Sequence, residues 1–471
     1  MLTLAEVLAA TGGTLVGTLP ADRGPRLSKL VVDSRAVTPG ALFVALRGAT
    51  HDGHAFVAQA LADGAAAALV ERVPEKRPDR AALVVVPSTP AALAAMARYA
   101  LDQYPDLTVV GITGSLGKTT TKEVVAGVLS SRCQVLKSEG NLNSEIGLPM
   151  TVLNGLHARD QPCEIAVLEM AMYQLGDIRL LARLARPRIG VVTCVLPIHL
   201  ERVGTIEGIQ QAKQELVEEL PADGVAVLNA DDPRVRQMAR ATSARVVRFG
   251  VSEIADVRAE HVDSHGLDGV VFDVLHAGQR RQVRLPLLGA HSVHAALAAT
   301  SVALELGFSL GDAASALEGL SPTLRLLVVD GVNGSRILDD SYNASPESVL
   351  AALNLLRELP GNRKIGVLGD MLELGTEEQA SHLRVGARAA EVLDLLIVYG
   401  PRSKVTADAA RRAGLAPSQV FEAATHADII ERLRAWLGPG DDVLVKGSLA
   451  MGMRGVVEGI RSVRAEGRVA R

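Results

Sequence analysis

A glycine-rich loop between an apolar run and a Lys-Thr-Thr sequence is the feature that most constrains the fold of this chain. Residues 111–123 have the sequence GITGSLGKTTTKE and directly follow the apolar residues 107–110. A strand that ends in glycines and continues into a helix lets backbone N–H groups converge on phosphate oxygens, and the helix dipole strengthens this attraction. The segment therefore predicts a phosphate-binding loop (P-loop) in a parallel α/β sheet.

The spacing of this loop is a variant of the strict P-loop pattern. The strict pattern G-x-x-x-x-G-K-[ST] is one residue shorter than G-x-x-G-x-x-G-K-T, which begins at Gly111. We expect Lys118 to reach the terminal phosphates of a nucleotide and Thr119 to hold Mg²⁺. A purely structural glycine turn is the alternative, and the order of strand, glycines, Lys-Thr-Thr and helix disfavours it. The residues expected to contact the nucleotide are Gly114, Ser115, Gly117, Lys118, Thr119 and Thr120.

The chain is too long for one hydrophobic core, and its patterns divide it into three segments. At 471 residues it exceeds the size at which single cores stop growing. Residues 1–104 alternate short apolar strands with alanine-rich helices, residues 105–319 surround the P-loop, and residues 320–471 contain strands that end in polar or glycine-rich loops. This alternation predicts parallel, helix-covered sheets with ligands at the carboxyl ends of their strands.

One stretch of the middle segment breaks the alternation of strands and helices. Residues 256–287 show a period of two in polar and apolar side chains, which is typical of antiparallel strands. We therefore expect an antiparallel insertion there, followed by a helix over residues 291–306.

The charge and cysteine content exclude several classes of protein. With 49 basic and 53 acidic residues, the net charge is −4, which gives no electrostatic basis for binding nucleic acid or a membrane surface. Three cysteines without paired spacing indicate a reducing compartment, with neither a disulfide framework nor a zinc motif. The N-terminus lacks the basic region of a signal peptide, and no apolar stretch reaches ~18 residues, so we expect a soluble, cytoplasmic protein without membrane insertion.

Three residues of the middle segment are candidates for metal binding, although each is weak evidence alone. Glu169 directly follows an apolar strand and would face the P-loop, where a carboxylate can hold Mg²⁺. A solvated acid at a strand end is the commoner case. His199 follows the next strand, and a lone histidine is more often a surface residue. Lys213 lies in an acid-rich helical segment, where the pattern predicts a solvated lysine, and an ammonium group cannot ligand a cation.

A polar cluster follows the first strand of the third segment. Its members are Asp339, Asp340, Ser341, Tyr342 and Asn343. The next residues predict a helix capped by Ser345. Two aspartates, a tyrosine and an asparagine exceed what a cap requires, so we expect this cluster to have a function of its own.

These motifs together resemble the Mur ligases, which are ATP-dependent enzymes that form amide bonds in peptidoglycan precursor synthesis. The resemblance runs along the whole chain through VVDSRAVTPGALFVALRG, GITGSLGKTTTKE, EGNLNSEIGLPMTVL, VLEMAM, HLERVGTIEGIQQAK, VLNADDPRV, DDSYNASPES, GDMLELG and VLVKGS. The P-loop segment, GNLNSEIGLP and DDSYNASPES are typical of the branch that adds D-alanyl-D-alanine. The branch that adds diaminopimelate or lysine usually carries D-N-P-R in its C-terminal domain, whereas the similar string here, residues 231–234, is central.

The resemblance implies an α/β fold of three domains, with a central P-loop domain and a C-terminal Rossmann-like domain. It also implies that Thr119 and Glu169 hold one Mg²⁺ and that His199 and Lys213 serve a second. In the family this lysine is carbamylated by CO₂, which converts a cation into an anionic oxygen ligand. Asn141 and Asn143 match substrate-binding residues near the reacting groups. The catalytic residues implied by the resemblance are Lys118, Asn143, His199 and Lys213.

The substrates follow from the same resemblance. Ser34 and Arg35 match a segment that binds the UDP portion of UDP-N-acetylmuramoyl-tripeptide, and D-alanyl-D-alanine supplies the amine. The γ-phosphoryl group of ATP would pass to the tripeptide carboxylate before the amine attacks. Members of this branch are generally monomers. The C-terminal residues that match those closing over ATP are Arg325, Asp340, Tyr342 and Asn343.

Several positions depart from the family pattern, mostly in segments expected around the nucleotide. Ala290 and Leu449 replace arginines, and Ser292 and Ala295 replace asparagines. The full set is Leu116, Cys194, Leu196, Ile198, Ala290, Ser292, Ala295, Leu324 and Leu449. Two hypotheses of different class follow: a working ligase, or a Mur-ligase fold with impaired ATP binding or lost turnover. A related ligase that adds a different amino acid is a third alternative.

Overall fold

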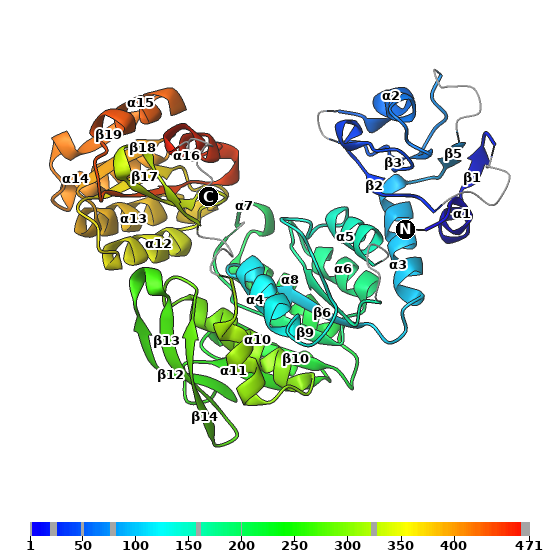
Figure 1. Ribbon diagram of the computed structural model, residues 1–471, viewed down its shortest axis with the longest axis horizontal. Helices are drawn as coiled ribbons and strands as arrows, with labels where there is room; N and C mark the ends of the chain where they lie inside the picture. Colours follow the sequence, from blue (N-terminus) through cyan, green and yellow to red (C-terminus); the bar gives the residue numbers. More distant parts are fainter. Residues whose placement is uncertain are drawn as a thin grey trace, which may run out of the picture.

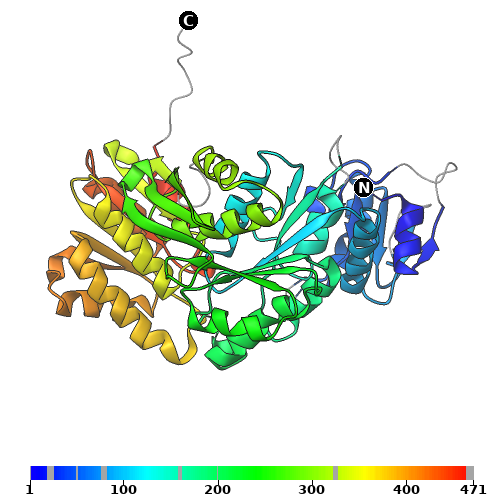
Figure 2. The ribbon, with the colours of Figure 1, turned by 90° about the horizontal axis from the view of Figure 1, so that it is seen from below.

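The computed structural model describes residues 2–18, 26–48, 51–75, 82–156, 162–198, 200–321 and 327–462. It contains three sheets that follow one another along the chain (Figure 1). The N-terminal and C-terminal sheets lie on opposite sides of the central one in both views (Figure 1, Figure 2). The predicted α/β class and three-domain architecture are confirmed.

The N-terminal sheet has five strands in the order β1-β5-β4-β3-β2. β1 pairs antiparallel with β5, and the other neighbouring strands are parallel. The strands are β1 (Thr14–Val16), β2 (Leu30–Val31), β3 (Leu42–Val44), β4 (Ala67–Val70) and β5 (Ala82–Val85). The helices are α1 (Leu4–Thr11), α2 (Val57–Ala62) and α3 (Thr89–Asp102). Because α3 packs against α1 and also against α5 (Gly147–Gly155), it joins this domain to the central one.

The central sheet has nine strands in the order β14-β13-β12-β11-β10-β9-β6-β8-β7. Its strands from β6 to β11 are parallel, whereas β13 pairs antiparallel with β12 and with β14. The predicted antiparallel insertion is therefore confirmed. The strands are β6 (Thr108–Thr113), β7 (Val135–Lys137), β8 (Ile165–Glu169), β9 (Ile189–Val192), β10 (Val225–Asn229), β11 (Arg245–Gly250), β12 (Val257–Ser264), β13 (Val270–His276) and β14 (Gln279–Leu285).

Successive residues of the central strands face two different helix layers, because side chains of a strand alternate between its two faces. Val110 and Ile112 pack in one core with residues of α4, α10 and α11, whereas Val109 packs in another core with residues of α6 and α8. This burial on both faces explains the apolar runs of the sequence. The remaining helices are α4 (Lys118–Leu129), α6 (Asp177–Ala185), α7 (Leu200–Val203), α8 (Ile206–Glu218), α9 (Pro233–Gln237), α10 (Ser292–Glu305) and α11 (Leu310–Glu318).

The C-terminal sheet has six strands in the order β15-β16-β20-β17-β18-β19. Only the β15–β16 pair among them is antiparallel. The strands are β15 (Leu327–Asp330), β16 (Arg336–Asp340), β17 (Lys364–Gly369), β18 (Leu395–Tyr399), β19 (Val420–Ala423) and β20 (Asp442–Lys446). The helices are α12 (Pro346–Glu358), α13 (Glu378–Val392), α14 (Ser403–Arg412), α15 (His426–Trp436) and α16 (Arg454–Ile460).

Direct contacts join the central and C-terminal domains. The guanidinium of Arg202 in α7 lies 2.9 Å from a carboxylate oxygen of Glu373, and the Ser264 hydroxyl donates to Glu358 at 2.5 Å. Leu288 packs against the core of the C-terminal domain. The two domains are thus joined by polar contacts from α7 and β12 and by an apolar contact from the segment before α10. Among the described helices, none combines the length and apolar character needed to cross a membrane.

Candidate active site

The P-loop has the strand–loop–helix geometry predicted from its sequence. β6 ends at Thr113, and α4 begins at Lys118. Gly114 lies against the segment after β9, where an added Cβ would come within 1.8 Å of the Thr193 hydroxyl oxygen. Its φ of 145° is also one that L-residues rarely adopt. Only glycine therefore fits at this position of the loop.

Hydrogen bonds hold the P-loop against the segment that follows β9. The backbone N–H of Ser115 donates to the Cys194 carbonyl at 2.8 Å, and its hydroxyl donates to the Leu196 carbonyl at 3.1 Å. The Leu116 N–H donates to the Cys194 sulfur at 3.3 Å, and the Leu116 carbonyl accepts from the Thr193 hydroxyl at 2.6 Å. The backbone of Leu116 is thus fixed on both sides, and these bonds do not involve its apolar side chain.

Lys118 lies over the loop that it terminates. Its Nζ donates to the carbonyl oxygens of Gly114, at 2.8 Å, and Ser115, at 3.2 Å. The ammonium group of Lys118 therefore lies against the backbone carbonyls of the loop. Thr119 and Thr120 follow in the first turn of α4 and are half-buried.

Thr119, Asn143 and Glu169 meet at the carboxyl ends of β6 and β8. Glu169 is the last residue of β8 and is only 2% exposed. Its Oε2 accepts a hydrogen bond from the Thr119 hydroxyl at 2.7 Å, and its Oε1 accepts from the Asn143 amide at 2.8 Å. These oxygens are ligands of the kind that Mg²⁺ prefers, so the residues present fit the predicted ion. Asn141, in contrast, is exposed.

Lys213 is buried, which corrects the expectation of a solvated lysine. Its side chain in α8 is 3% exposed. Burial, together with the smaller effect of the positive charge of Lys118, lowers the pKa of Lys213 to about 7. The helical spacing could have indicated this, because Lys213 lies four residues after Ile209 and three before Leu216, on the buried face of α8. The structure thus brings Lys213 within electrostatic range of the P-loop lysine.

Two predicted site residues, His199 and Arg325, lie outside the described residues, as does the departure at Leu324. Among the residues that are described, no group of three His, Cys, Asp or Glu side chains could hold a metal. The predicted ligand set contains a threonine, a lysine and His199, so it stays a prediction.

The C-terminal cluster combines a capping role with a buried ion pair. Asp340 ends β16, and its carboxylate lies 2.5 Å from Nζ of Lys446, which is only 2% exposed and ends the neighbouring β20. Lys446 also donates to the Asn343 carbonyl at 2.9 Å. Ser345 caps α12 as predicted. Lys446 was not among the predicted site residues, although its place at the end of an apolar strand could have indicated a role. Tyr342 is 45% exposed.

Ser34 and Arg35 lie on the surface of the N-terminal domain. They form a short 3₁₀ turn, and the Arg35 guanidinium contacts Asp33 at 2.6 Å while 89% of its side chain is exposed. The hydrogen bonds from Arg35 lower the pKa of Asp33 to about 2. This turn packs against α2 of its own domain.

The departures around α10 remove polar groups without disturbing the packing. Ser292 is 1% exposed and donates to the Gly289 carbonyl at 2.8 Å, and Ala295 is 5% exposed. Ala290 and Leu449 are exposed. Residues 231–234, the string similar to D-N-P-R, start α9: Asp232 accepts from the backbone N–H groups of Arg234 and Val235.

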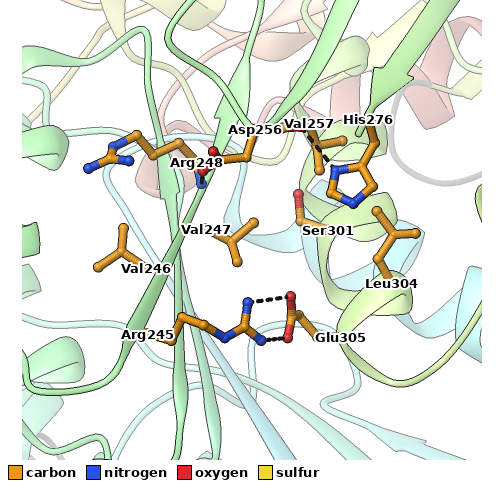
Figure 3. Close-up of a pocket in the computed structure, with 10 residues that line it drawn as sticks. All are labelled: Arg245, Val246, Val247, Arg248, Asp256, Val257, His276, Ser301, Leu304 and Glu305. Atoms are coloured by element: carbon orange, nitrogen blue, oxygen red, sulfur yellow. Dashed lines mark hydrogen bonds and ion pairs between the residues drawn. The ribbon is translucent and has the colours of Figure 1, made fainter. Parts of the chain in front are cut away.

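A cavity of about 310 Å³ lies elsewhere in the central domain (Figure 3). Its lining includes Arg245 at the start of β11 and Glu305 at the end of α10, which are joined by an ion pair. The P-loop lies at the carboxyl ends of the parallel strands, whereas Arg245 lies at the opposite end of β11. This cavity is therefore not part of the predicted nucleotide site.

The chain matches three family models in succession. Residues 26–100 match the Mur ligase family catalytic domain, residues 112–303 the Mur ligase middle domain, and residues 324–449 the Mur ligase glutamate ligase domain. A UDP-N-acetylmuramoyl-tripeptide–D-alanyl-D-alanine ligase of Mycobacterium tuberculosis is 37% identical, over 98% of this chain and 97% of that protein. The chain belongs to the Mur ligase family.

Other Mur ligases are similar along nearly the whole chain. The enzyme of the same name from Escherichia coli is 34% identical over 92% of this chain and 94% of its own. The crystal structure of MurF from Acinetobacter baumannii superposes with a TM-score of 0.84 at 29% identity, over 97% of this chain and 98% of that one. MurF ligase from Thermotoga maritima, solved in complex with ADP, gives 0.77 at 32% identity, over 92% and 97%.

Proposed function

We propose that this chain is an ATP-dependent ligase that joins D-alanyl-D-alanine to the terminal carboxylate of UDP-N-acetylmuramoyl-tripeptide. The observation that carries the proposal is the meeting of Lys118, Thr119, Asn143, Glu169 and Lys213 at one edge of the central sheet. The similar full-length proteins named for this reaction support the same substrates.

The chemistry requires activation of the carboxylate, because oxide is a poor leaving group. Transfer of the γ-phosphoryl group of ATP gives an acyl phosphate, and the amine of the dipeptide then displaces phosphate. Lys118 and the loop N–H groups would hold the phosphates, and Asn143 and Asn141 would bind near the reacting groups. Catalysis is then mostly positioning and electrostatic stabilisation. Mg²⁺ held by Thr119 and Glu169 would neutralise charge on the phosphates.

Lys213 would serve a second Mg²⁺ together with His199. Only a neutral amine reacts with CO₂, and a buried lysine with a pKa of about 7 is partly neutral at physiological pH. Carbamylation would place an anionic oxygen ligand where the sequence has a cation. The burial of Lys213 therefore supports the role that the family resemblance implies.

The outer domains would contribute the remaining contacts. Arg325, Asp340, Tyr342 and Asn343 would close over ATP, a motion that excludes water from the reaction. Ser34 and Arg35 of the N-terminal domain would bind the UDP portion. We further propose domain boundaries at residues 104/105 and 319/320, a monomeric state and a cytoplasmic location.

Phosphate release in the presence of ATP, UDP-N-acetylmuramoyl-tripeptide and D-alanyl-D-alanine tests this function. We expect release only with all three substrates, and loss of release in Lys118→Ala with an unchanged fold by circular dichroism. Normal turnover by that variant would refute the P-loop assignment. No release by the folded wild type would favour the second candidate, a Mur-ligase fold without turnover, which the apolar Ala295 and Leu449 support. Release with another amino acid in place of the dipeptide would favour a related ligase.

A further inference from the structure

The N-terminal turn of α10 brings a histidine to the carboxyl end of β10. Nε2 of His294 lies 2.8 Å from Oδ2 of Asp231, two residues after the end of β10 at Asn229. Neither residue belongs to the predicted site. The pair therefore needs an explanation of its own.

Asp231 is held in a fixed, ionised state. The backbone N–H of Val251 donates to its Oδ2 at 2.8 Å, and that of Ser252 donates to its Oδ1 at 2.9 Å. Partial burial opposes ionisation of Asp231, but the hydrogen bonds from His294 and from the two backbone groups outweigh it and lower its pKa. Because an ionised carboxylate only accepts hydrogen bonds, Nε2 of His294 carries the proton. Nδ1 is then the ring nitrogen left to face a ligand, and it accepts a hydrogen bond in the tautomer that is protonated at Nε2 alone.

The pair lies on the side of the P-loop opposite to the Glu169 cluster. The sheet order is β11-β10-β9-β6-β8, and Glu169 ends β8. In the other direction, the Ser115 N–H donates to the Cys194 carbonyl, and the Val195 N–H donates to Asp232 at 2.7 Å. Asp232 is the neighbour of Asp231. The proposed reacting groups lie near Glu169 at the end of β8. The side of the P-loop toward β10 and α10 is then available for the nucleoside part of the nucleotide.

The first turn of α10 offers few polar groups to such a nucleoside. The Ser292 hydroxyl is buried and bonded to a backbone carbonyl, and Ala295 has no polar group. His291 lies in electrostatic range of Asp340 and Lys446 of the C-terminal domain. The side chain of His294 is 36% exposed, so its ring can contact a ligand.

We propose that His294, oriented by Asp231, is the residue that selects the nucleobase, with Nδ1 accepting a hydrogen bond from the exocyclic amino group of adenine. The proposal rests on the proposed function, because it requires a nucleotide on the P-loop. Hypoxanthine carries a carbonyl oxygen at the same position, which would face the Nδ1 acceptor without a hydrogen bond. The nucleotide site should therefore prefer adenine.

Calorimetric titration of the full chain with ADP and with IDP tests this role, since the two bases differ at C6, amino against carbonyl, and at the adjacent N1, acceptor against N–H donor. We expect the wild type to prefer ADP. His294→Ala should lose roughly 3- to 10-fold in ADP affinity and keep its IDP affinity. His294→Gln should retain much of the preference, because one amide can both donate to Asp231 and accept from adenine. The matched control is His276→Ala, which changes a histidine of β13 outside the site and should bind both nucleotides as the wild type does.

Two results would overturn the role of His294. An unchanged preference for ADP in a folded His294→Ala would remove it from base recognition, and an equal loss of ADP and IDP would leave it a structural role only. A folded wild type that binds neither nucleotide would overturn the proposed function together with this inference. Thermal unfolding of each variant identifies those that fail to fold.

Discussion

At the scale of single residues, the site is built around two buried ionisable groups with different surroundings. Glu169 is 2% exposed and accepts hydrogen bonds from Thr119 and Asn143. Lys213 is 3% exposed, and burial together with the charge of Lys118 lowers its pKa to about 7. A buried charge without a partner is costly, so the protein is stabilised by keeping Lys213 neutral or by modifying it.

The lowered pKa of Lys213 predicts a pH-dependent stability. Between the folded pKa of about 7 and the ordinary value of 10.5, the unfolded chain binds more protons at this residue than the folded protein does. The free energy of unfolding therefore rises with pH across this window. The destabilisation that Lys213 causes is largest at and below pH 7 and is relieved as the pH rises toward 10.5. In CO₂-depleted buffer, we expect Lys213→Met to be more stable than the wild type at pH 7, by on the order of 4 kcal/mol, and this difference to shrink at pH 9.

Urea unfolding at the two pH values measures this difference. Lys404→Met is the matched control, because Lys404 is exposed and its loss should leave the pH dependence of the wild type unchanged. The same pH dependence in Lys213→Met and the wild type would contradict a lowered pKa at Lys213.

At the scale of elements, the conformation of the P-loop depends on the segment after β9. Thr193, Cys194 and Leu196 make hydrogen bonds with backbone or hydroxyl groups of the loop. Leu116 takes part in these bonds only through its backbone N–H and carbonyl. This explains how the loop can carry a leucine at position 116, where the family usually has asparagine or serine.

Gly114→Ala should disrupt this contact between the two segments. Its Cβ would lie within 1.8 Å of the Thr193 hydroxyl oxygen and 3.1 Å of the Cys194 nitrogen, so the loop must move away from β9. We expect loss of phosphate release and a stability decrease of about 2–4 kcal/mol, measured by urea unfolding. In Gly117→Ala, an added Cβ meets no atom within 4 Å, and only the backbone strain of its positive φ remains. If Gly117→Ala lost as much stability as Gly114→Ala, the clash with Thr193 would not be the cause of the stability loss in Gly114→Ala.

At the scale of the whole molecule, the proposed nucleotide site is shared between two domains. The P-loop and α10 belong to the central domain, whereas Asp340, Lys446 and Leu449 belong to the C-terminal domain. The Arg202–Glu373 contact holds the two together near α7. If a nucleotide binds there as proposed, the departures from the family pattern at Ala290 and Leu449 would act on this shared region.

Restoring two family residues should strengthen nucleotide binding. Ala290 and Leu449 are exposed, so arginine fits at both positions without disturbing a core. A hydrogen bond to a charged group contributes about 1.5–3 kcal/mol. We therefore expect Ala290→Arg with Leu449→Arg to bind an ATP analogue roughly 10- to 100-fold more tightly, measured by calorimetry, whereas Leu116→Asn should change affinity little.

The control adds the same two charges elsewhere, in Leu180→Arg with Leu267→Arg, at two exposed positions. Equal, tight binding by the wild type and the restored variant would show that the departures are neutral in an active, divergent ligase. A gain of the same size in the control would assign the effect to net charge.

The sequence by itself determined the elements and their order. Apolar strands followed by glycines or polar residues predicted parallel sheets and the P-loop, because strand periodicity, glycine conformations and helix caps depend on neighbours close in the chain. The capping of α12 by Ser345, the antiparallel insertion and the membership of the Mur ligase family were all accessible in this way.

Only the tertiary structure decided which charges are buried and which partners they have. Lys213 has acidic neighbours in the sequence, yet it is buried and within electrostatic range of Lys118. Lys446 and Asp340 are separated by more than a hundred residues and become neighbours through strand pairing. His294 meets Asp231 because α10 packs against β10. Burial and electrostatic interaction depend on all atoms within a few ångströms, and most of these come from segments that a local sequence pattern does not contain.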